Sequence, residues 1–308
     1  MRLPIACALA AVAFLPAESS AQTVFRSGID LVNLGVAVMD REGRAVENLT
    51  IADFEVIENG RKQEIRYFAR ADDESVERPP LHIGLVFDTS GSMTYDIDLA
   101  RSAAIQFLNR LQRAEDITVV DFDTEVRIAT YGQDDFTRLV SRLRGRKPEG
   151  WTALYDAVGV YLGSAFELQG QKVLIIFTDG GDTRSAMTYS DLLNTVKASD
   201  VTVYAIGLLQ NQSHSLRTQQ RLQLAQLADV SGGEAYFPSS LKEVEKIYDR
   251  IVQEIDTRYL LGYVSTDTRH DGRWRPLQVR LTRPELKEVR VRTRKGYFAP
   301  YEETNGRK

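Results

Sequence analysis

The spacing of apolar residues changes twice along the 308-residue chain. In 24–70 the apolar residues recur at every second position, a period that predicts strands with one face toward solvent. Between 81 and 257, uninterrupted apolar runs alternate with segments in which apolar residues recur every three or four positions. That alternation predicts a parallel, doubly wound sheet with helices on both faces. In 258–300 the period of two returns, which predicts further strands.

The α/β segment is expected to begin with the stretch 81–87, an apolar run that contains no acidic or basic residue apart from one histidine. Such a run is typical of a strand that helices cover on both faces. Further strands are predicted at 117–122, 126–131, 173–177, 201–206 and 235–237. Helices are predicted at 95–111, 134–143, 152–168, 189–198, 216–230 and 241–257, and Asp134 is expected to cap the second of them.

Two signals set the organisation of the first β segment. Asn59-Gly60 is a strong indicator of a tight hairpin, so the chain is expected to reverse there into a return strand that contains Gln63 and Phe68. Residues 71–80 are polar and end in two prolines, a composition typical of a linker.

The β segments 24–70 and 258–300 stand on either side of the α/β segment. The simplest arrangement that buries their apolar faces is one small β-sandwich built from both, with 81–257 as an α/β domain inserted in it or flanked by it. The last residues, 301–308, are expected to be a tail.

The first residues, 1–21, have the pattern of a secretory signal peptide. Met1-Arg2 precedes an apolar stretch, 3–16, that is too short to span a bilayer core of about 30 Å. We therefore expect cleavage after Ala21, export to the periplasm or the outside of the cell, and no membrane span. The only cysteine, Cys7, lies in this segment, so no disulfide is expected in the mature chain.

The formal net charge of −4 excludes little by itself. From Arg258 to Lys308, however, 13 Lys or Arg stand against 6 Asp or Glu. A nucleic-acid or anionic-surface patch is one interpretation of that excess. We favour the solvated faces of edge strands, where charge discourages association between sheets, and no nucleic acid is expected as a partner of an exported protein. The sequence carries no signal for an oligomeric state.

Oxygen-bearing side chains follow the apolar run 81–87 at alternate positions. Asp88, Ser90 and Ser92 stand in a turn in which Gly91 can adopt backbone conformations that other residues resist. One carboxylate and two hydroxyls form a set of hard oxygen ligands that suits a divalent cation such as Mg²⁺.

The run Asp88-Thr89-Ser90-Gly91-Ser92 resembles the DxSxS metal-ion-dependent adhesion site of von Willebrand factor A (VWA) domains. The resemblance implies a VWA domain over 81–257 and two further ligand loops. GWTALYD at 150–156 resembles the second loop, and FTDGGD at 177–182 resembles the third. The resemblance therefore implies Mg²⁺ or Mn²⁺ held by Asp88, Ser90, Ser92, Thr152 and Asp179.

The layout of the whole chain resembles the secreted VWFA-related proteins of acidobacteria and similar bacteria. The residues that carry this second resemblance are Leu49-Thr50, Asp53-Phe54, Glu58-Asn59-Gly60, Tyr259-Leu260-Leu261-Gly262-Tyr263 and Arg294-Lys295-Gly296-Tyr297-Phe298.

Ligands of an open α/β sheet bind beyond the carboxyl ends of the strands, where the strand order reverses. We therefore expect the strand that ends at Phe87 to lie beside the one that ends at Phe177, which would place Asp88 and Asp179 in one crevice. With two carboxylates at most, a bound ion keeps an open, electrophilic position, and a carboxylate of a protein partner is expected to fill it. The expected function is that of an exported, non-enzymatic protein-binding module.

Two alternatives stay open from the residues alone. In the first, the metal only orders the loops of a structural scaffold. In the second, the aspartate after the buried strand is the nucleophile of a haloacid dehalogenase-like phosphohydrolase. The acid of such enzymes would have to be Ser90, and a hydroxyl of ordinary pKa does not donate protons near neutral pH.

We expect structural roles for the remaining acids and histidines: a turn for Asp182, a strand end for Asp121 and Asp123, core packing for His82, a polar loop for His214 and a turn for His270.

Overall fold

The computed structural model of the chain describes residues 31–70, 79–111, 113–286 and 288–302. The expected signal peptide, most of the expected linker and most of the expected tail lie outside these residues. Within them, no helix is long and apolar enough to cross a membrane.

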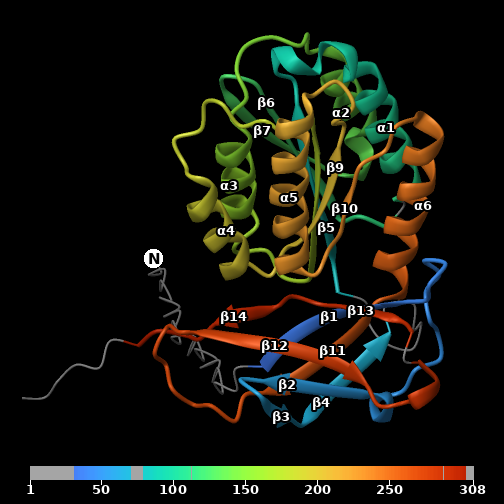
Figure 1. Cartoon of the computed structure of the whole chain (residues 1–308), viewed down its shortest axis with the longest axis vertical. Coiled ribbons are helices and arrows are strands. Elements are labelled where there is room, and N and C mark those ends of the chain that lie inside the picture. The colour runs from blue at the N-terminus through green and yellow to red at the C-terminus, as the bar shows by residue number, and fades with distance from the viewer. Residues whose placement is uncertain (1–30, 71–78, 112, 287, 303–308) are drawn as a thin grey trace, which may run out of the picture. The chain divides into compact units, whose positions relative to one another are not determined.

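A six-stranded sheet lies at the centre of the α/β domain (Figure 1). Its neighbouring strands run parallel except for β6 and β7, so the predicted doubly wound, mostly parallel sheet is confirmed. The chain passes from β5 to β6 on one side and later returns to β8 on the other side, so the strand order reverses between β5 and β8. In spatial order the strands are β10 (Ala235–Tyr236), β9 (Thr202–Gly207), β8 (Gln171–Thr178), β5 (Leu81–Asp88), β6 (Asp116–Phe122) and β7 (Val126–Tyr131).

Helices cover both faces of this sheet (Figure 1), which explains why β5 is apolar throughout and buried at every position. Leu85 and Phe87 belong to the core that contains the apolar residues of α1, α2 and α6, whereas Val86 belongs to the core on the other face, with α3, α4 and α5. The helices are α1 (Ile97–Arg110), α2 (Phe136–Gly145), α3 (Leu154–Ser164), α4 (Tyr189–Ala198), α5 (His214–Ser231) and α6 (Leu241–Thr257).

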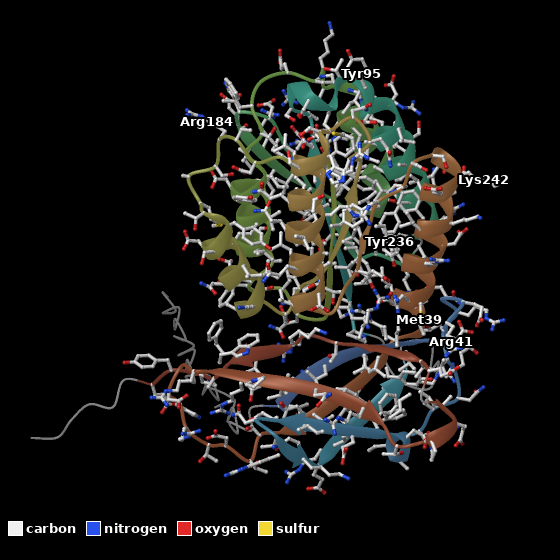
Figure 2. All side chains as sticks on the ribbon, viewed as in Figure 1. Met39, Arg41, Tyr95, Arg184, Tyr236 and Lys242 are labelled. Carbon is white, nitrogen blue, oxygen red and sulfur yellow. The ribbon has the colours of Figure 1, made fainter. Side chains whose placement is uncertain are left out.

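Short 3₁₀ helices precede α1 and α2, so both helices begin two residues later than predicted. The segment η2 (Gly91–Tyr95) precedes α1, and its last side chain, Tyr95, projects outward at the end of the domain where β5 ends (Figure 2). The segment η3 (Gln133–Asp135) precedes α2, so the expected capping by Asp134 is wrong. The residue before α2 is Asp135, and its carboxylate binds Arg138 instead of the helix backbone.

Two four-stranded antiparallel sheets form a β-sandwich, and each sheet combines strands from both ends of the described chain. The inner faces share one core, in which Val36, Val56 and Leu261 are almost fully buried. The predicted sandwich is therefore confirmed. One sheet has the order β13 (Arg290–Arg292), β1 (Leu31–Met39), β11 (Tyr259–Val264) and β4 (Ile65–Arg70); the other has the order β14 (Gly296–Phe298), β12 (Trp274–Leu281), β2 (Phe54–Glu58) and β3 (Arg61–Gln63). The 3₁₀ helices η1 (Ile51–Asp53) and η4 (Pro284–Leu286) lie in its connections.

The hairpin predicted at Asn59-Gly60 is present. Both residues have positive φ, 50° and 76°, and Glu58 lies opposite Arg61, as a two-residue hairpin of the favoured twist requires. The expected single return strand is wrong, because the chain changes sheets after β3. The strand β3 pairs with β2, whereas β4 pairs with β11 in the opposite sheet.

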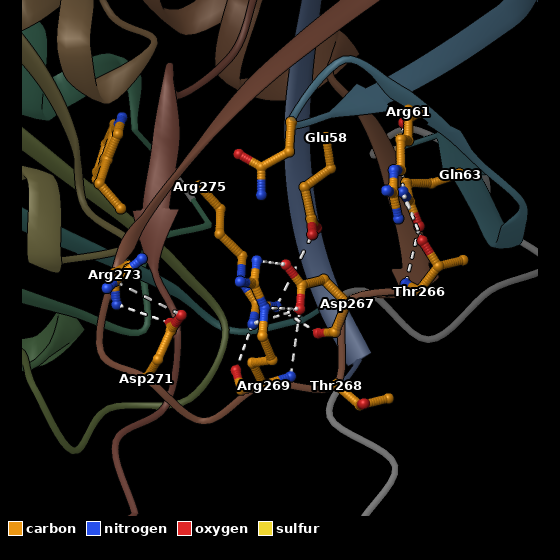
Figure 3. A pocket seen from close by; sticks show the side chains of 12 residues that line it. Glu58, Arg61, Gln63, Thr266, Asp267, Thr268, Arg269, Asp271, Arg273 and Arg275 are labelled. Carbon is orange, nitrogen blue, oxygen red and sulfur yellow. Dashed lines mark hydrogen bonds and ion pairs between the residues drawn. The ribbon is translucent and has the colours of Figure 1, made fainter.

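A polar network lies in the sandwich around Glu58 and Arg275 (Figure 3). The Arg275 side chain is only 4% exposed, and its Nη1 donates to Asp267 O at 2.7 Å. Glu58 accepts hydrogen bonds from Tyr263 Oη at 2.7 Å and from Ser265 Oγ at 2.6 Å. These contacts satisfy both charged groups inside the protein.

The basic excess of the C-terminal segment therefore has two parts. Arg280 and Arg290 are exposed, as expected for the outer faces of strands. The same expectation is wrong for Arg275 and for Arg292, because Arg292 binds Glu234 and the buried Glu254 of α6.

The chain leaves the sandwich for the α/β domain and returns from it at neighbouring positions of one sheet. Arg70, the last residue of β4, lies directly opposite Tyr259, the first residue of β11. Both ends of the domain are thus attached to two strands that are hydrogen-bonded to each other.

Candidate metal centre

The expected neighbourhood of the two acidic loops is confirmed by the sheet. Phe87 of β5 lies directly opposite Phe177 of β8, and the two strands run parallel. Asp88 is the last residue of β5, and Asp179 directly follows β8. Both carboxylates therefore emerge at the same edge of the sheet, at the point where its strand order reverses.

Asp88 is completely buried and is held by groups on both loops. Its Oδ1 accepts a hydrogen bond from Ser90 N at 2.9 Å, and its Oδ2 accepts one from Thr178 Oγ1 at 2.6 Å. The hydroxyls of Ser90 and Ser92 lie 3.0 Å apart and form a hydrogen bond. The three oxygen-bearing residues of the first loop are thus joined in one chain of contacts.

Asp179 keeps one oxygen without a partner. Its Oδ2 accepts a hydrogen bond from Gln212 Nε2 at 3.1 Å, whereas its Oδ1 is buried and meets no donor in the described part of the chain. None of the ion pairs among residues 31–302 that the structure describes involves Asp88 or Asp179. A buried carboxylate oxygen without a donor is a costly arrangement that a cation would relieve.

The two carboxylates act on each other electrostatically. Burial, and next the negative charge of Asp179, raise the pKa of Asp88 to about 7. Burial also raises the pKa of Asp179, while the neighbouring Ser92 hydroxyl lowers it. Carboxylate and hydroxyl oxygens are the donors that Mg²⁺ and Mn²⁺ accept, so the residues present fit such an ion.

Thr152 is placed by bonds between the second and third loops. Its N donates to Thr183 Oγ1 at 3.0 Å, and its carbonyl oxygen accepts from Thr183 N at 2.9 Å. Thr152, Ser92 and Asp179 line one pocket, whose volume is about 430 Å³. The structure thus brings together all five residues, because Asp88 and Ser90 are bonded to this group.

The first and second loops are also bonded to each other. Gly91 N donates to Gly150 O at 3.1 Å, and Glu149 N donates to Thr89 O at 3.0 Å. Gly150 has a φ of +73°, and a Cβ at this residue would lie 2.5 Å from Thr124 Oγ1. A side chain at position 150 would therefore displace Thr124, whose hydroxyl accepts a hydrogen bond of 2.9 Å from Trp151 N of the second loop.

Two residues of the site have no counterpart in the sequence predictions. Thr178 supports Asp88, but it ends an apolar strand and looks like one more strand residue. Gln212 supports Asp179 from a loop without any periodic pattern. Only the pairing of β5 with β8 and the path of the chain after β9 bring these side chains to the carboxylates.

Other predicted roles are resolved by the contacts. Asp182 has its expected turn role, since its Oδ2 accepts from Tyr155 N at 3.0 Å and from Ser185 Oγ at 2.6 Å. Asp121 does not cap a strand end, because it lies within β6 and binds Arg127 and Arg142.

The histidines have structural positions. His82 is buried in β5, and its two ring nitrogens lie 2.7 Å from Asp116 Oδ2 and 2.9 Å from Gln169 O. His214 begins α5 instead of lying in a loop, because that helix starts two residues earlier than predicted.

The number of acidic groups distinguishes this centre from a typical metal cluster. Among the described residues, no three His, Cys, Asp or Glu side chains gather into a cation site. Of the five predicted ligands, two are carboxylates and three are neutral hydroxyls.

An open, mostly parallel α/β sheet whose strand order reverses at an oxygen-lined crevice defines a doubly wound ligand-binding domain. The model of the von Willebrand factor type A domain matches residues 82–250 of the chain. Because this match covers more than half of the sequence, the protein belongs to the von Willebrand factor type A domain family.

Two bacterial proteins are similar to parts of the chain. The uncharacterized protein sll0103 of Synechocystis sp. is 30% identical over 154 residues, which cover 48% of this chain and 36% of that protein. The uncharacterized protein YwmC of Bacillus subtilis is 25% identical over 205 residues, covering 59% of this chain and 87% of that protein. The chain thus spans little more than a third of the Synechocystis protein.

Solved structures include similar folds. The pilus adhesin SpaC of Lactobacillus rhamnosus GG in its open conformation is 11% identical, with a TM-score of 0.49 and coverage of 86% of this chain and 48% of that one. The vWF domain of the pilus tip protein Mfa5 from Porphyromonas gingivalis is 13% identical, with a TM-score of 0.46 and coverage of 57% and 96%.

Proposed function

We propose that the protein is an exported binding module, of the adhesion or scaffold type, with a metal-ion-dependent adhesion site. In this proposal Asp88, Ser90, Ser92, Thr152 and Asp179 hold Mg²⁺ or Mn²⁺, and a protein partner contributes an acidic residue. The observation that carries the proposal is the pair of buried carboxylates on neighbouring parallel strands, next to a pocket and without a basic partner among the described residues.

The chain's own residues set the properties of such a site. A bound divalent cation would supply the positive charge that attracts a partner's carboxylate. Ser90, Ser92 and Thr152 are neutral, so the protein would leave part of that charge uncompensated. Trp151 and Tyr95 stand beside the pocket and on the adjoining η2, 64% and 85% exposed, and offer apolar surface for the partner around the acidic contact.

The proposal has two further parts that rest on the sequence. Export follows from the signal-peptide pattern of residues 1–21, and the layout of the chain favours the bacterial secreted VWFA-related proteins. A non-enzymatic role follows from Ser90, which occupies the position where a haloacid dehalogenase-like phosphohydrolase needs an acid. Turnover of an aryl phosphate that is lost in Asp88→Asn would overturn this last part.

Metal binding is tested first, by calorimetric titration of Mg²⁺ and Mn²⁺ into protein stripped with EDTA. We expect saturable binding of about one ion per chain, and its loss in Asp88→Ala. Asp182→Asn is the matched control, because it removes a carboxylate of the same pocket that already binds Tyr155 N and Ser185. Equal binding by wild type and Asp88→Ala, or loss of binding in the control alone, would contradict the ligand assignment.

Partner binding is tested by capture from envelope extract, with and without EDTA. We expect capture that requires the metal and is lost in Asp88→Ala. The scaffold alternative predicts that metal raises the melting temperature while capture is unchanged.

A further inference from the structure

The pocket beside the proposed metal site has a lining of unusual chemistry. It is formed by residues of all three loops, by α5 and by the loop before α5, and its lining among the described residues contains no lysine or arginine. Its two acids are Asp179, assigned to the metal, and Asp182, whose oxygens are used within the protein. The wall contributed by α5 and the loop before it carries four amide side chains, Gln212, Gln219, Gln220 and Gln223.

Gln220 is the one of these amides that is buried without a partner. The residue is only 5% exposed, and its Oε1 is buried and meets no donor in the described part of the chain. By contrast, Gln212 donates to Asp179, and Gln223 Oε1 accepts from Tyr155 Oη.

The third loop holds Gln220 next to the metal-site residues. A Cβ on Gly180 would lie 2.9 Å from Gln220 Cβ, and a Cβ on Gly181 would lie 3.0 Å from Gln220 Nε2. These glycines directly follow Asp179 in the chain. Because Gly181 has no side chain, nothing from that residue fills the space beside Gln220 Nε2, and both residues line the pocket that Asp179 also lines.

We propose that the pocket recognises a peptide in which the acidic residue bound at the metal site stands next to an asparagine or glutamine, whose side-chain amide pairs with Gln220. This inference rests on the proposed function. An asparagine or glutamine side chain can donate to Gln220 Oε1, the atom that meets no donor in the described part of the chain, and can accept from the Gln220 NH2 group. A lining without basic residues gives a second charged side chain no counter-charge, so a neutral polar neighbour is favoured.

A peptide is favoured over a neutral sugar because one peptide can carry both a carboxylate and a side-chain amide. A neutral sugar brings hydroxyls to Gln220 but no carboxylate to the metal site, whereas adjacent residues of a peptide bring both groups. A pocket of about 430 Å³ has room for a pair of side chains and lies at the small end of ligand sites, which run from about 300 to 1,000 Å³.

The test uses arrays of short, glycine-flanked peptides in which one Asp is preceded or followed by Asn, Gln, Ala, Leu, Lys or Glu. An array of neutral and acidic oligosaccharides is probed in parallel, with Mg²⁺ or EDTA present throughout. We expect peptides with Asn or Gln beside Asp to be retained about tenfold better than those with Ala. Gln220→Leu should abolish that preference while binding still requires both Asp and Mg²⁺.

Two further variants serve as a second perturbation of the Gln220 amide and as a control. Gly181→Ala leaves Gln220 in place but crowds its amide, so it should reduce the same preference. Gln226→Leu changes an exposed glutamine of α5 that lies outside the pocket, and it should behave as wild type. A preference that is absent in wild type, or that persists in Gln220→Leu, overturns the inference and leaves the proposed function standing.

Two other outcomes are also decisive. Retention of acidic oligosaccharides but of no peptide would overturn the peptide assignment in favour of a sugar. Binding that depends on neither Asp nor Mg²⁺ would overturn the proposed function, and this inference with it.

Discussion

Thr178 Oγ1 donates a hydrogen bond of 2.6 Å to Asp88 Oδ2, and the same hydroxyl accepts one of 2.9 Å from Gly180 N. One buried side chain thereby links the carboxylate at the end of β5 to the loop that carries Asp179. In metal sites, partners of this kind fix the orientation of the ligand itself.

Replacement of Thr178 by valine should weaken metal binding without changing the fold. The isosteric valine cannot donate to Asp88, so the carboxylate loses its orientation, and we expect Mg²⁺ affinity to fall by about 10- to 100-fold in a calorimetric titration. Thr118→Val is the matched control, because this buried strand threonine bonds only to Thr130 of β7. Unchanged affinity in Thr178→Val would show that Thr178 does not support a metal ligand.

Asp88→Asn should stabilise the metal-free protein and remove the stabilisation by metal. The substitution removes one of two mutually repelling buried charges, while its remaining carbonyl oxygen can still accept from Ser90 N or Thr178. Thermal melts in EDTA should therefore show a higher melting temperature than wild type. At Mg²⁺ about 100-fold above its Kd, wild type should gain about 2.7 kcal/mol and the variant nothing. A lower melting temperature of the variant in EDTA would contradict this prediction. It would mean that the hydrogen bonds to the charged carboxylate stabilise the protein by more than the burial of that charge costs.

Substitutions at Gly84 of β5 and at Tyr161 of α3 should have coupled effects on the free energy of unfolding. A Cβ on Gly84 would lie 2.2 Å from the buried Tyr161 ring, so Gly84→Ala should lower the free energy of unfolding by about 3 kcal/mol. Tyr161→Leu should restore part of that loss in the double variant, whereas Tyr161→Phe keeps the ring and should not. Alone, Tyr161→Phe should be neutral or stabilise by about 1 kcal/mol, because the Tyr161 hydroxyl is buried and meets no partner among the described residues. Denaturant unfolding of wild type, the two single variants and the two double variants measures these changes.

Asp53 should make the sandwich sensitive to acid. Hydrogen bonds from Thr50 N at 2.6 Å, and next the Arg283 guanidinium at 2.6 Å, hold the pKa of Asp53 below its ordinary value against the effect of burial. A lowered pKa in the folded state means stabilisation that is complete above the unfolded pKa of about 3.9 and is lost as the pH falls through the folded pKa.

We therefore expect Asp53→Asn to cost about 1–2 kcal/mol of unfolding free energy at pH 7 and progressively less below about pH 4. Asp191→Asn is the control, since Asp191 makes the same contact with Thr188 at the start of α4 but has no arginine partner in the described structure. A difference between Asp53→Asn and wild type that stays constant down to pH 2 would contradict the assignment.

The sequence was sufficient for those features in which residue type alone determines geometry. The charge-free run of β5 predicted a strand covered on both faces, and the rule of strand-order reversal then predicted its neighbour β8 and the meeting of Asp88 with Asp179. Asn59-Gly60 predicted its hairpin because both residues accept positive φ.

Other features depend on tertiary contacts that leave no local pattern. The return strand after Gly60 divides between two sheets because β3 and β4 find different partners. Arg292 has the spacing of a solvent-facing residue, yet it binds the buried Glu254 of α6, whereas Arg275 shares the inward face of β12 with Leu277 and Val279 and lies beside the buried Glu58. Thr178 and Gln212 became part of the site only through the positions of β8 and of the loop after β9.

The pairing of Arg70 with Tyr259 determines how mechanical load would travel through the protein. If the chain is stretched between Leu31 and Glu302, the force passes from strand to strand through the ladder of β4, β11 and β1. The α/β domain is attached as a side branch of that ladder, so tension reaches it only after β4 and β11 separate. The crevice at the carboxyl ends of β5 and β8 therefore carries no tension while β4 and β11 remain paired.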